Sequence, residues 1–592
     1  MRIPFNFDQR NANVDLLVFA QSHRFVQPGS CYRGSCAGYF LGSALPVTVF
    51  RPMLAGGIIS CDSLRTHKMK TMKPGILAVL LLGLIPSGAL MQTRTRPQFR
   101  IEEATIRELQ QEMRARRLTC RELVKHYLNR IEAYDKKGPA INSLVVVNPG
   151  VMERAAELDA QFMRSGFVGP LHCVPVIVKD NFETRDLPTT AGSLSLAGWV
   201  SSKDAFQVRK IREAGAIILA KSNMAEFAFS PYETVSSILP GYTRNPYALD
   251  RVTAGSSGGT AASVAASFGA VGLGSDTGNS IRGPAAHQAL VGIRSTMGLT
   301  SRAGVVPLNL AADIAGPIAL TVEDAVAVFQ VIAGRDPDDP ATAVSEGKPI
   351  PRYADALVKG GLKGVRLGVL KQAFETPTTD PEIVQLFQRA IAELRKAGAT
   401  VVDSVMIPNL DELRRAQTGG CNQFKWDLNR YLQSREPKPP VTSLDEIIRL
   451  RKFHPTIQPR LESGNVGDIP PESNPGCRSR DRFREQLRES VVKLMDDNKL
   501  DALIYPTWSN PPRLIGDLNT PHGDNNQLFA PSTGFPAITV PMGYSRDNTL
   551  PAGLQFFGRA WDEFLLIRLA YAYEQTTHYR RPPATTPVIP RK

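Results

Sequence analysis

The feature that most constrains this chain is a glycine- and serine-rich stretch at residues 255–284, which reads GSSGGTAASVAASFGAVGLGSDTGNSIRGP. Two dense clusters, GSSGG and SDTGNSIRGP, are joined in it by small uncharged residues. Glycine permits positive φ and lets a ligand approach the main chain, so that successive N–H groups can converge on one point. A serine in this setting can be a nucleophile when a base lies within reach. The stretch therefore indicates either a serine-based active site or a loop that only turns the chain.

Other glycine motifs fit this stretch poorly. No GxxxxGK[ST] or GxGxxG string occurs between a predicted strand and a predicted helix, which argues against a phosphate-binding loop. GSSGG satisfies G-x-S-x-G with Ser257 at its centre, but a nucleophile elbow requires a buried strand just before the serine. Residues 245–254, NPYALDRVTA, are polar and contain proline. We therefore do not interpret the serine cluster as an elbow.

A candidate base lies upstream, in GPLHCVPVIVKDN at residues 169–181. Its apolar core, 174–178, predicts a buried strand that ends in Lys179. Burial disfavours the ammonium form, so such a lysine tends to lose its proton. A lysine after an apolar run is more often only an exposed strand end. Here it is followed, in order, by Ser256 and Ser280 in the two glycine-serine clusters.

This combination resembles the amidase signature family, and the similarity runs from about residue 105 to about residue 574. The resemblance implies a Ser-Ser-Lys triad in which Ser280 is the nucleophile, Ser256 the proton relay and Lys179 the base. It also implies a cis peptide bond at the relay serine. The expected reaction is hydrolysis of a carboxylic amide C–N bond through an acyl-enzyme.

The resemblance assigns further residues around this triad. Oxyanion-hole donors, each typically worth roughly 3 to 4 kcal/mol, are expected from the backbone N–H groups of Thr277, Gly278, Asn279 and Ser280. Supporting residues are expected at Ser257, Asp276 and Arg282, the last two as an ion pair. A substrate pocket is expected at Met224 and Phe227 and in residues 421–426. Asn279 stands where many members have glycine, and asparagine best tolerates positive φ among the other residues.

The regular elements predict an α/β chain. Capping boxes at Thr105 and Thr119, each with Glu three residues later, predict the first two helices. Strands expected at 141–148, 174–178 and 216–223 alternate with helices, which implies a mixed, largely parallel β-sheet covered by helices on both faces. Pro- and Asp-rich residues 436–476 are expected to form loops or an insertion. One large domain at 90–592 accounts for these elements.

The first 89 residues differ from the rest. Residues 1–68 contain scattered Arg and few acids, which fits either an upstream start or a transit-like extension. Residues 69–89 resemble a signal peptide: basic residues, an apolar run and small residues before a cleavage site after Ala89. The apolar run is shorter than the roughly 20 residues of a membrane span. We expect export if translation starts near Met69 or Met72, and otherwise a cytoplasmic or organellar protein.

Several function classes are disfavoured. The formal net charge is +14, but no nucleic-acid-binding motif accompanies it, and no metal or organic cofactor is expected. Cysteines 120, 173, 421 and 477 lack zinc-site spacing and allow disulfides without demanding them; Cys173 fits a small buried hydrophobe. The oligomeric state cannot be read from the sequence.

Three functions remain open. The first is a free-standing amidohydrolase acting on a small-molecule amide, whose acyl and amine specificity and ester or carbamate activity are undetermined. Residues 421–432, CNQFKWDLNRYL, resemble the FKxDLNxYL segment of stand-alone members. The second is a glutaminase-type subunit of a tRNA-dependent amidotransferase. The third is a non-catalytic binding protein on the same fold.

Overall fold

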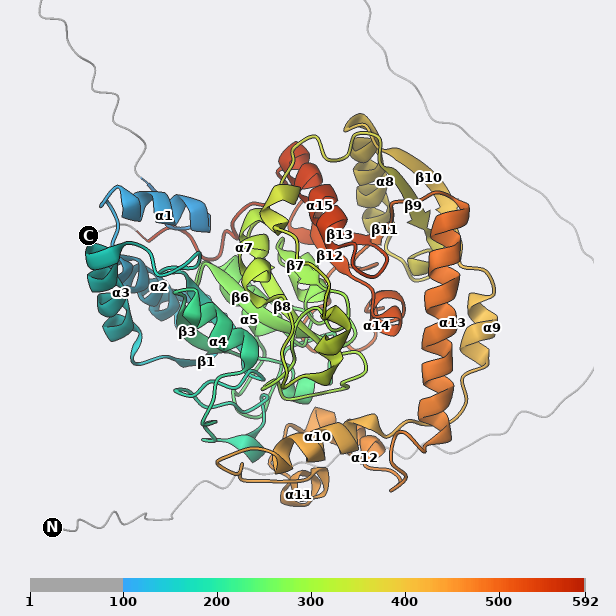
Figure 1. Ribbon diagram of the computed structural model, residues 1–592, viewed down its shortest axis with the longest axis horizontal. Coiled ribbons are helices and arrows are strands. Elements are labelled where there is room, and N and C mark those ends of the chain that lie inside the picture. The colour runs from blue at the N-terminus through green and yellow to red at the C-terminus, as the bar shows by residue number, and fades with distance from the viewer. Residues whose placement is uncertain (1–98, 590–592) are drawn as a thin grey trace, which may run out of the picture. The chain divides into compact units, whose positions relative to one another are not determined.

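The computed structural model describes residues 99–589 of the 592 residues, and they form one compact unit with a central β-sheet (Figure 1). The predictions for residues 1–68 and 69–89 lie outside the described residues. Within the described part, no helix has both the length and the apolar composition needed to cross a membrane.

The sheet has eleven strands in the order β1-β3-β2-β6-β8-β7-β12-β13-β11-β9-β10, and β4 and β5 form a separate two-stranded ribbon. The strands are β1 Leu144–Val147, β2 Pro175–Lys179, β3 Ile217–Ser222, β4 Arg244–Asn245, β5 Ala248–Val252, β6 Val271–Asp276, β7 Val291–Arg294, β8 Ile314–Ala319, β9 Arg366–Leu370, β10 Thr400–Val405, β11 Ala502–Pro506, β12 Ala537–Ser545 and β13 Leu550–Phe557.

The sheet is mixed, as expected, but parallel pairs do not predominate. Parallel pairing joins β2 to β3 and β6, and β9 to β10 and β11. The remaining six neighbouring pairs of this sheet are antiparallel. The reason is clearest in the β12–β13 hairpin, where a short turn allows antiparallel pairing only, because parallel neighbours need a long crossover. The two parallel groups lie toward opposite ends of the sheet.

Helices cover this sheet and cap its ends. They are α1 Ile106–Arg114, α2 Cys120–Tyr134, α3 Val151–Ser165, α4 Phe206–Glu213, α5 Gly258–Ala265, α6 Arg282–Ala286, α7 Val322–Ile332, α8 Pro381–Lys396, α9 Leu410–Arg415, α10 Gln423–Gln433, α11 Leu444–Leu450, α12 Gln458–Gly464, α13 Pro475–Asp497, α14 Phe529–Thr533 and α15 Glu563–Thr577. Both predicted capping boxes are present, at the starts of α1 and α2. Residues 436–476, expected to form loops or an insertion, contain α11 and α12, whose apolar residues pack against α10.

The strands of the sheet interior are buried along their whole length, which requires cover on both faces. The edge strands β1 and β10 are partly exposed. Figure 1 shows α1 to α3 at one end of the sheet, α8 and α13 at the other, and α10 to α12 grouped together. The expected cover of helices on both faces of one large sheet is therefore confirmed.

The glycine-rich stretch forms the end of a loop, α5, β6 and the turn into α6. Close approach explains its glycines. A Cβ on Gly259 would lie 2.2 Å from the carbonyl oxygen of Asn223, and one on Gly258 would lie 2.1 Å from Thr234 Oγ1. The small residues of α5 pack against Ile281 and Ala285 in a cluster of their own. This packing places the two serine clusters of the sequence next to each other across α5 and β6.

Candidate active site

Lys179 is the last residue of β2, in the parallel part of the sheet between β3 and β6, and its side chain is fully buried. Its Nζ donates hydrogen bonds to Ser256 Oγ over 2.7 Å and to Ser275 Oγ over 2.9 Å. Burial lowers the pKa of this amine from 10.5 to about 7, although the carboxylates of Asp276 and Asp313 oppose the shift. A substantial fraction of Lys179 is therefore neutral near pH 7 and can accept a proton.

Ser256 is the residue of the GSSGG cluster that contacts Lys179. The Gly255–Ser256 peptide bond is cis, as the resemblance implied, and the Ser256 carbonyl accepts from Ala225 N over 3.1 Å. The next residue, Ser257, precedes α5, and its Oγ donates to the Ser275 carbonyl over 3.2 Å. Ser257 is thus buried and is not an exposed elbow serine, which agrees with the rejection of that motif. Its supporting role stays a prediction.

Ser275 is a functional candidate that the sequence reasoning missed. It lies on β6, and its Oγ accepts from both Lys179 Nζ and Asn181 Nδ2, the latter over 3.0 Å. Its carbonyl accepts from Ser257 and from Lys179. The residue is inside the recognised SDTGNSIRGP cluster, but only the parallel pairing of β2 with β6 brings it to the lysine. It links the two predicted serine clusters.

The turn that carries Ser280 runs from Asp276, at the end of β6, to Arg282, at the start of α6. Ser280 itself is 5% exposed. Asp276 Oδ2 accepts from the backbone N–H of Ile281 over 3.0 Å and from Arg282 Nε over 3.1 Å, which confirms the predicted ion pair. Arg282 also donates to the Gly278 carbonyl over 2.6 Å. These bonds tie both ends of the turn together.

A second arginine, Arg294, also holds this turn. Its Nη1 lies 2.9 Å from Asp276 Oδ1, and all three charged side chains, Asp276, Arg282 and Arg294, are fully buried. Burial alone would raise the pKa of Asp276, but the two guanidinium groups and their hydrogen bonds hold that pKa well below its ordinary value. Arg294 ends β7, and its sequence context carries no signal for this contact.

Two acidic side chains hold the predicted oxyanion residues from other elements. Thr277 Oγ1 donates to Asp313 Oδ1, and Asp313 Oδ2 accepts from the backbone N–H groups of residues 308 and 309. Asn279 Nδ2 donates to Asp524 Oδ1 over 3.0 Å. Burial raises the pKa of Asp524 to about 6, against the effect of the hydrogen bonds that it accepts. Sequence reasoning found neither acid, because both are distant along the chain.

Gly278 and Asn279 show why these residue types stand in the turn. A Cβ on Gly278 would lie 3.1 Å from Gln527 Oε1, so a larger residue would displace that side chain. Asn279 is fully buried and is not among the residues with positive φ. Its amide therefore serves the hydrogen bond to Asp524, and tolerance of positive φ does not account for it.

The two segments expected to form a substrate pocket do pack together. Met224 and Phe227 are buried, and the Phe227 ring lies 6.4 Å from the ring of Phe424 on α10, measured between centroids. Phe229 lies closer to the same ring, at 4.7 Å. Beside these residues a small cavity is bordered by Ala228, Ser275 and several further residues. The aromatic cluster thus lies near Ser275, but its contact with a substrate stays a prediction.

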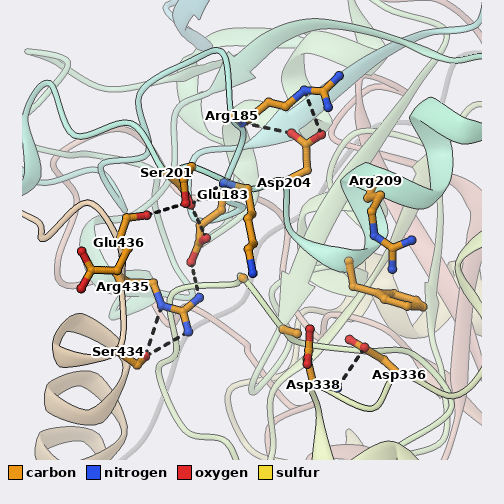
Figure 2. A pocket seen from close by; sticks show the side chains of 15 residues that line it. Glu183, Arg185, Ser201, Asp204, Arg209, Asp336, Asp338, Ser434, Arg435 and Glu436 are labelled. Atoms are coloured by element: carbon orange, nitrogen blue, oxygen red, sulfur yellow. Dashed lines mark hydrogen bonds and ion pairs between the residues drawn. The ribbon is translucent and has the colours of Figure 1, made fainter.

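A cavity of about 640 Å³ lies elsewhere in the described part of the chain (Figure 2). Its lining is mostly charged and includes Glu183, Arg185, Asp204, Arg209 and Arg435, and none of the triad residues. The buried Glu183 carboxylate is already engaged by Arg435 and Ser201. This cavity therefore lacks the groups that the triad chemistry needs.

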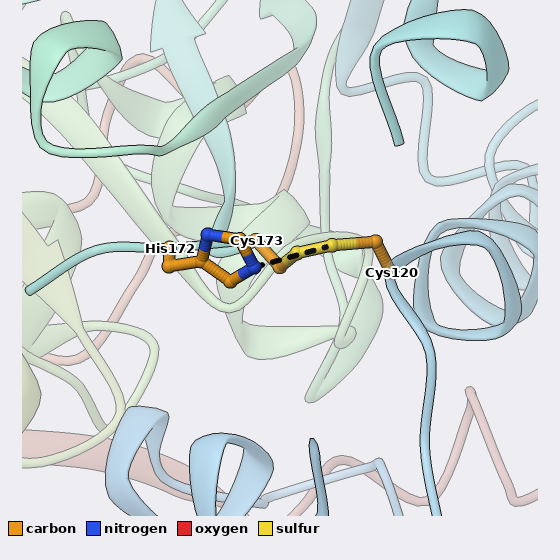
Figure 3. A group of neighbouring side chains, drawn as sticks. All are labelled: Cys120, His172 and Cys173. Carbon is orange, nitrogen blue, oxygen red and sulfur yellow. Dashed lines mark hydrogen bonds between the residues drawn. A yellow bond between two sulfur atoms is a disulfide. The ribbon is translucent and has the colours of Figure 1, made fainter. Parts of the chain in front are cut away.

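All four cysteines of the described residues are paired. Cys421 is bonded to Cys477, and Cys120, at the start of α2, is bonded to Cys173, just before β2. His172 Nε2 lies 4.0 Å from Cys120 Sγ (Figure 3). Because both sulfur atoms of the trio are bonded to each other, neither is a thiolate ligand, and only the histidine could bind a metal. Cys173 is buried, as expected, and is also a disulfide partner.

Comparison with known proteins identifies the family of this chain. The family model described as Amidase matches residues 122–567. A probable amidase from Arabidopsis thaliana is 36% identical over 86% of this chain and 97% of its own length. A glutamyl-tRNA(Gln) amidotransferase subunit from Acinetobacter baumannii is 32% identical over 81% of this chain and 97% of its own length.

The solved structures include a similar protein at the same level of identity. The native peptide amidase of Stenotrophomonas maltophilia is 36% identical, with a TM-score of 0.74 over 82% of this chain and 99% of that one. The family match covers most of the chain, and its span contains Lys179, Ser256 and Ser280. The chain therefore belongs to the amidase signature family.

Proposed function

We propose that this amidase hydrolyses its substrate through an acyl-enzyme on Ser280, with Ser256 as proton relay and Lys179 as base. The observation that carries the proposal is the 2.7 Å contact between Lys179 Nζ and Ser256 Oγ, at a lysine whose pKa is lowered by burial to about 7. A charged lysine could only donate to Ser256. The neutral amine can instead accept its proton.

In this reaction, protons pass between Ser280 and Lys179 by way of Ser256. Ser280 Oγ attacks the amide carbonyl as its proton passes to Ser256, whose own proton passes to neutral Lys179. The developing oxyanion is stabilised by backbone N–H groups of residues 277–280. The proton returns from Lys179 through Ser256 to the leaving nitrogen, because an unprotonated amide nitrogen is a poor leaving group. Water, deprotonated by the same relay, then attacks the acyl carbonyl. The relay returns this proton to Ser280 Oγ as the ester bond breaks, and the acid is released.

The test uses the full chain and its Ser280→Ala variant. We expect release of amine or ammonia from a panel of aliphatic, aryl and peptide amides, and a single fluorophosphonate adduct seen by intact mass. Both should be lost in the variant, while circular dichroism and the melting temperature stay unchanged. Turnover that persists in Ser280→Ala would contradict the assignment of the nucleophile. The likeness to peptide amidase makes peptide amides the first class to test.

A second function is favoured by one observation, the 32% identity to the glutamyl-tRNA(Gln) amidotransferase subunit over 97% of that protein. A chain of that kind would release ammonia from glutamine and pass it to a partner. Expression in its native host with an affinity tag would decide between the two. A stoichiometric second protein would support the glutaminase, and amide turnover by the isolated chain would support the free-standing enzyme. A non-catalytic protein would show neither turnover nor adduct.

We also propose that the chain is exported, with residues 69–89 as its signal peptide. The two disulfides formed by all four cysteines of residues 99–589 support this, because disulfides persist in oxidising compartments. N-terminal sequencing of the mature protein should begin at Leu90. A mature protein that begins well before Leu90, or that stays inside the cell with reduced cysteines, would contradict it.

A further inference from the structure

Two arginines on α13 stand out among the charged residues that the reaction does not use. Arg480 and Arg484 are one helical turn apart, so they lie on the same face of α13. This part of the helix is held firmly. Cys477 is bonded to Cys421, just before α10, and Asn474 Nδ2 donates to Asn422 Oδ1 over 3.1 Å. The arginine pair therefore has a fixed position relative to α10.

The positive charges of these two guanidinium groups have few acidic partners among the described residues. Arg484 is only 9% exposed, and its ion pair in the described part of the chain is a 3.5 Å contact with Asp481, whose side chain is 63% exposed. Arg480 Nε is buried and has no hydrogen-bond partner among the described residues; the same is true of Trp426 Nε1 on α10. Buried charges in proteins are normally paired, because burial of an isolated cation is costly. Arg480 Nε and Trp426 Nε1 are therefore available to bind an anion.

Other charges near the pair increase this positive excess. Burial, and then the positive charges of Arg480, Arg488 and Arg294, lower the pKa of Arg484 to about 10. The acids that act on Arg480 are the exposed Asp481 and, on α10, Asp427. The two oxygens of Asp427 already accept from Leu310 N over 2.8 Å and from Gln423 Nε2 over 2.6 Å.

Hydrogen bonds and charges connect the surroundings of Arg480 and Arg484 to the turn that carries Ser280. Leu310, bonded to Asp427, belongs to the loop that ends at Asp313, and Asp313 accepts from Thr277 Oγ1 in the turn. Arg294, whose charge acts on Arg484, contacts Asp276 at the other end of the same turn. The arginine pair is thus connected, through Asp427 with the loop that ends at Asp313 and through Arg294, to the turn that would hold the oxyanion.

We propose that Arg480 and Arg484 form an anion-binding subsite that selects amide substrates carrying a carboxylate at a distance from the scissile amide. This inference rests on the proposed function. A carboxylate accepts two parallel hydrogen bonds from a guanidinium group, and loss of such a charged contact typically costs a factor of ten or more in binding. The chemical class is the monoamides of dicarboxylic acids and peptide amides with acidic side chains.

The experiment compares matched pairs of substrates with the full chain. Monoamides of dicarboxylic acids with two to six methylenes are assayed beside alkyl amides of the same length. We expect kcat/KM to favour the charged member by at least tenfold at the best length, and Arg480→Gln and Arg484→Gln each to lower this ratio at least tenfold, mainly through KM. Arg482→Gln is the control, because Arg482 is exposed on the same helix. Its ratio should equal that of the wild type.

A second measurement keeps the test independent of turnover and of folding. Titration of glutarate into the Ser280→Ala chain should show saturable binding that Arg480→Gln weakens at least tenfold, and Arg484→Lys, which keeps the charge, serves if Arg484→Gln does not fold. Equal kcat/KM values for charged and neutral amides, together with no glutarate binding, would overturn the subsite and leave the amidase mechanism standing. Glutarate binding without turnover of any amide would support the subsite and refute the mechanism.

Discussion

The pKa of Lys179 makes a quantitative prediction for the pH dependence of the reaction. With a pKa of about 7, roughly a tenth of Lys179 is neutral at pH 6 and roughly nine tenths at pH 8. We expect kcat/KM for an uncharged amide to rise about tenfold between these pH values and to be level above pH 8. A lysine at its ordinary pKa of 10.5 would instead give a rate that still rises tenfold per pH unit at pH 9.

The assay is steady-state amide hydrolysis from pH 5 to 10 with one neutral substrate. Lys179→Met, which keeps the volume and removes the base, should lose at least a hundredfold in kcat/KM and lose this pH dependence, since general base catalysis is typically worth about 10² to 10⁴. A wild-type rate that continues to rise to pH 10 would refute the assignment of a neutral lysine near pH 7. So would a flat profile.

The lowered pKa of Lys179 also makes the stability of the folded chain depend on pH. Between pH 7 and 10.5 the unfolded chain binds a proton at this position and the folded chain does not, so the free energy of unfolding rises with pH in that window. The full gain is at most about 5 kcal/mol, at about 1.4 kcal/mol per pKa unit. The measurement is the difference in unfolding free energy between the wild type and Lys179→Met. This difference should increase from pH 7 to 10.

Three further predictions concern residues that hold the site. Ser275→Ala removes a hydrogen bond from Lys179. Because Lys179 becomes charged when it takes the proton, and a hydrogen bond to a charged group contributes about 1.5 to 3 kcal/mol, kcat/KM should fall about 10- to 100-fold without a large change in melting temperature. Burial raises the pKa of the Asp524 carboxyl to about 6, so Asp524→Asn should abolish any inflection of the pH profile near pH 6. An inflection that persists in this variant would belong to another group. Opening the Cys421–Cys477 disulfide by double substitution with serine should lower the unfolding free energy by about 4 kcal/mol for a loop of 56 residues, as checked by denaturant titration, and an unchanged midpoint would contradict this.

Much of the site could be predicted from sequence because its key residues lie in short local patterns. The apolar run before Lys179 predicts a buried strand, and the structure buries the lysine at the end of this strand, which lowers its pKa. The turn from Asp276 to Arg282 is equally local, and the structure confirms the ion pair across it. The contact of Lys179 with Ser256 was expected by resemblance, and the structure places them 2.7 Å apart.

The prediction of parallel strands was only partly right for a physical reason. Alternation of strands and helices favours parallel neighbours, but it does not reveal which strands become neighbours. The β6 strand pairs in parallel with β2 and antiparallel with β8. The sheet order, and with it the balance of pair types, depends on packing across the whole domain.

The sequence by itself determined the family, the order of the chemical groups and the local turns, because glycine, capping residues and apolar runs act on a few neighbouring residues. Tertiary structure decided which distant groups support them. Ser275, Arg294, Asp313 and Asp524 reach Lys179 and the turn that carries Ser280 only through strand pairing and through loops far apart in the chain. Their roles depend on hydrogen-bond distances of about 3 Å, and only the folded arrangement of elements sets such distances.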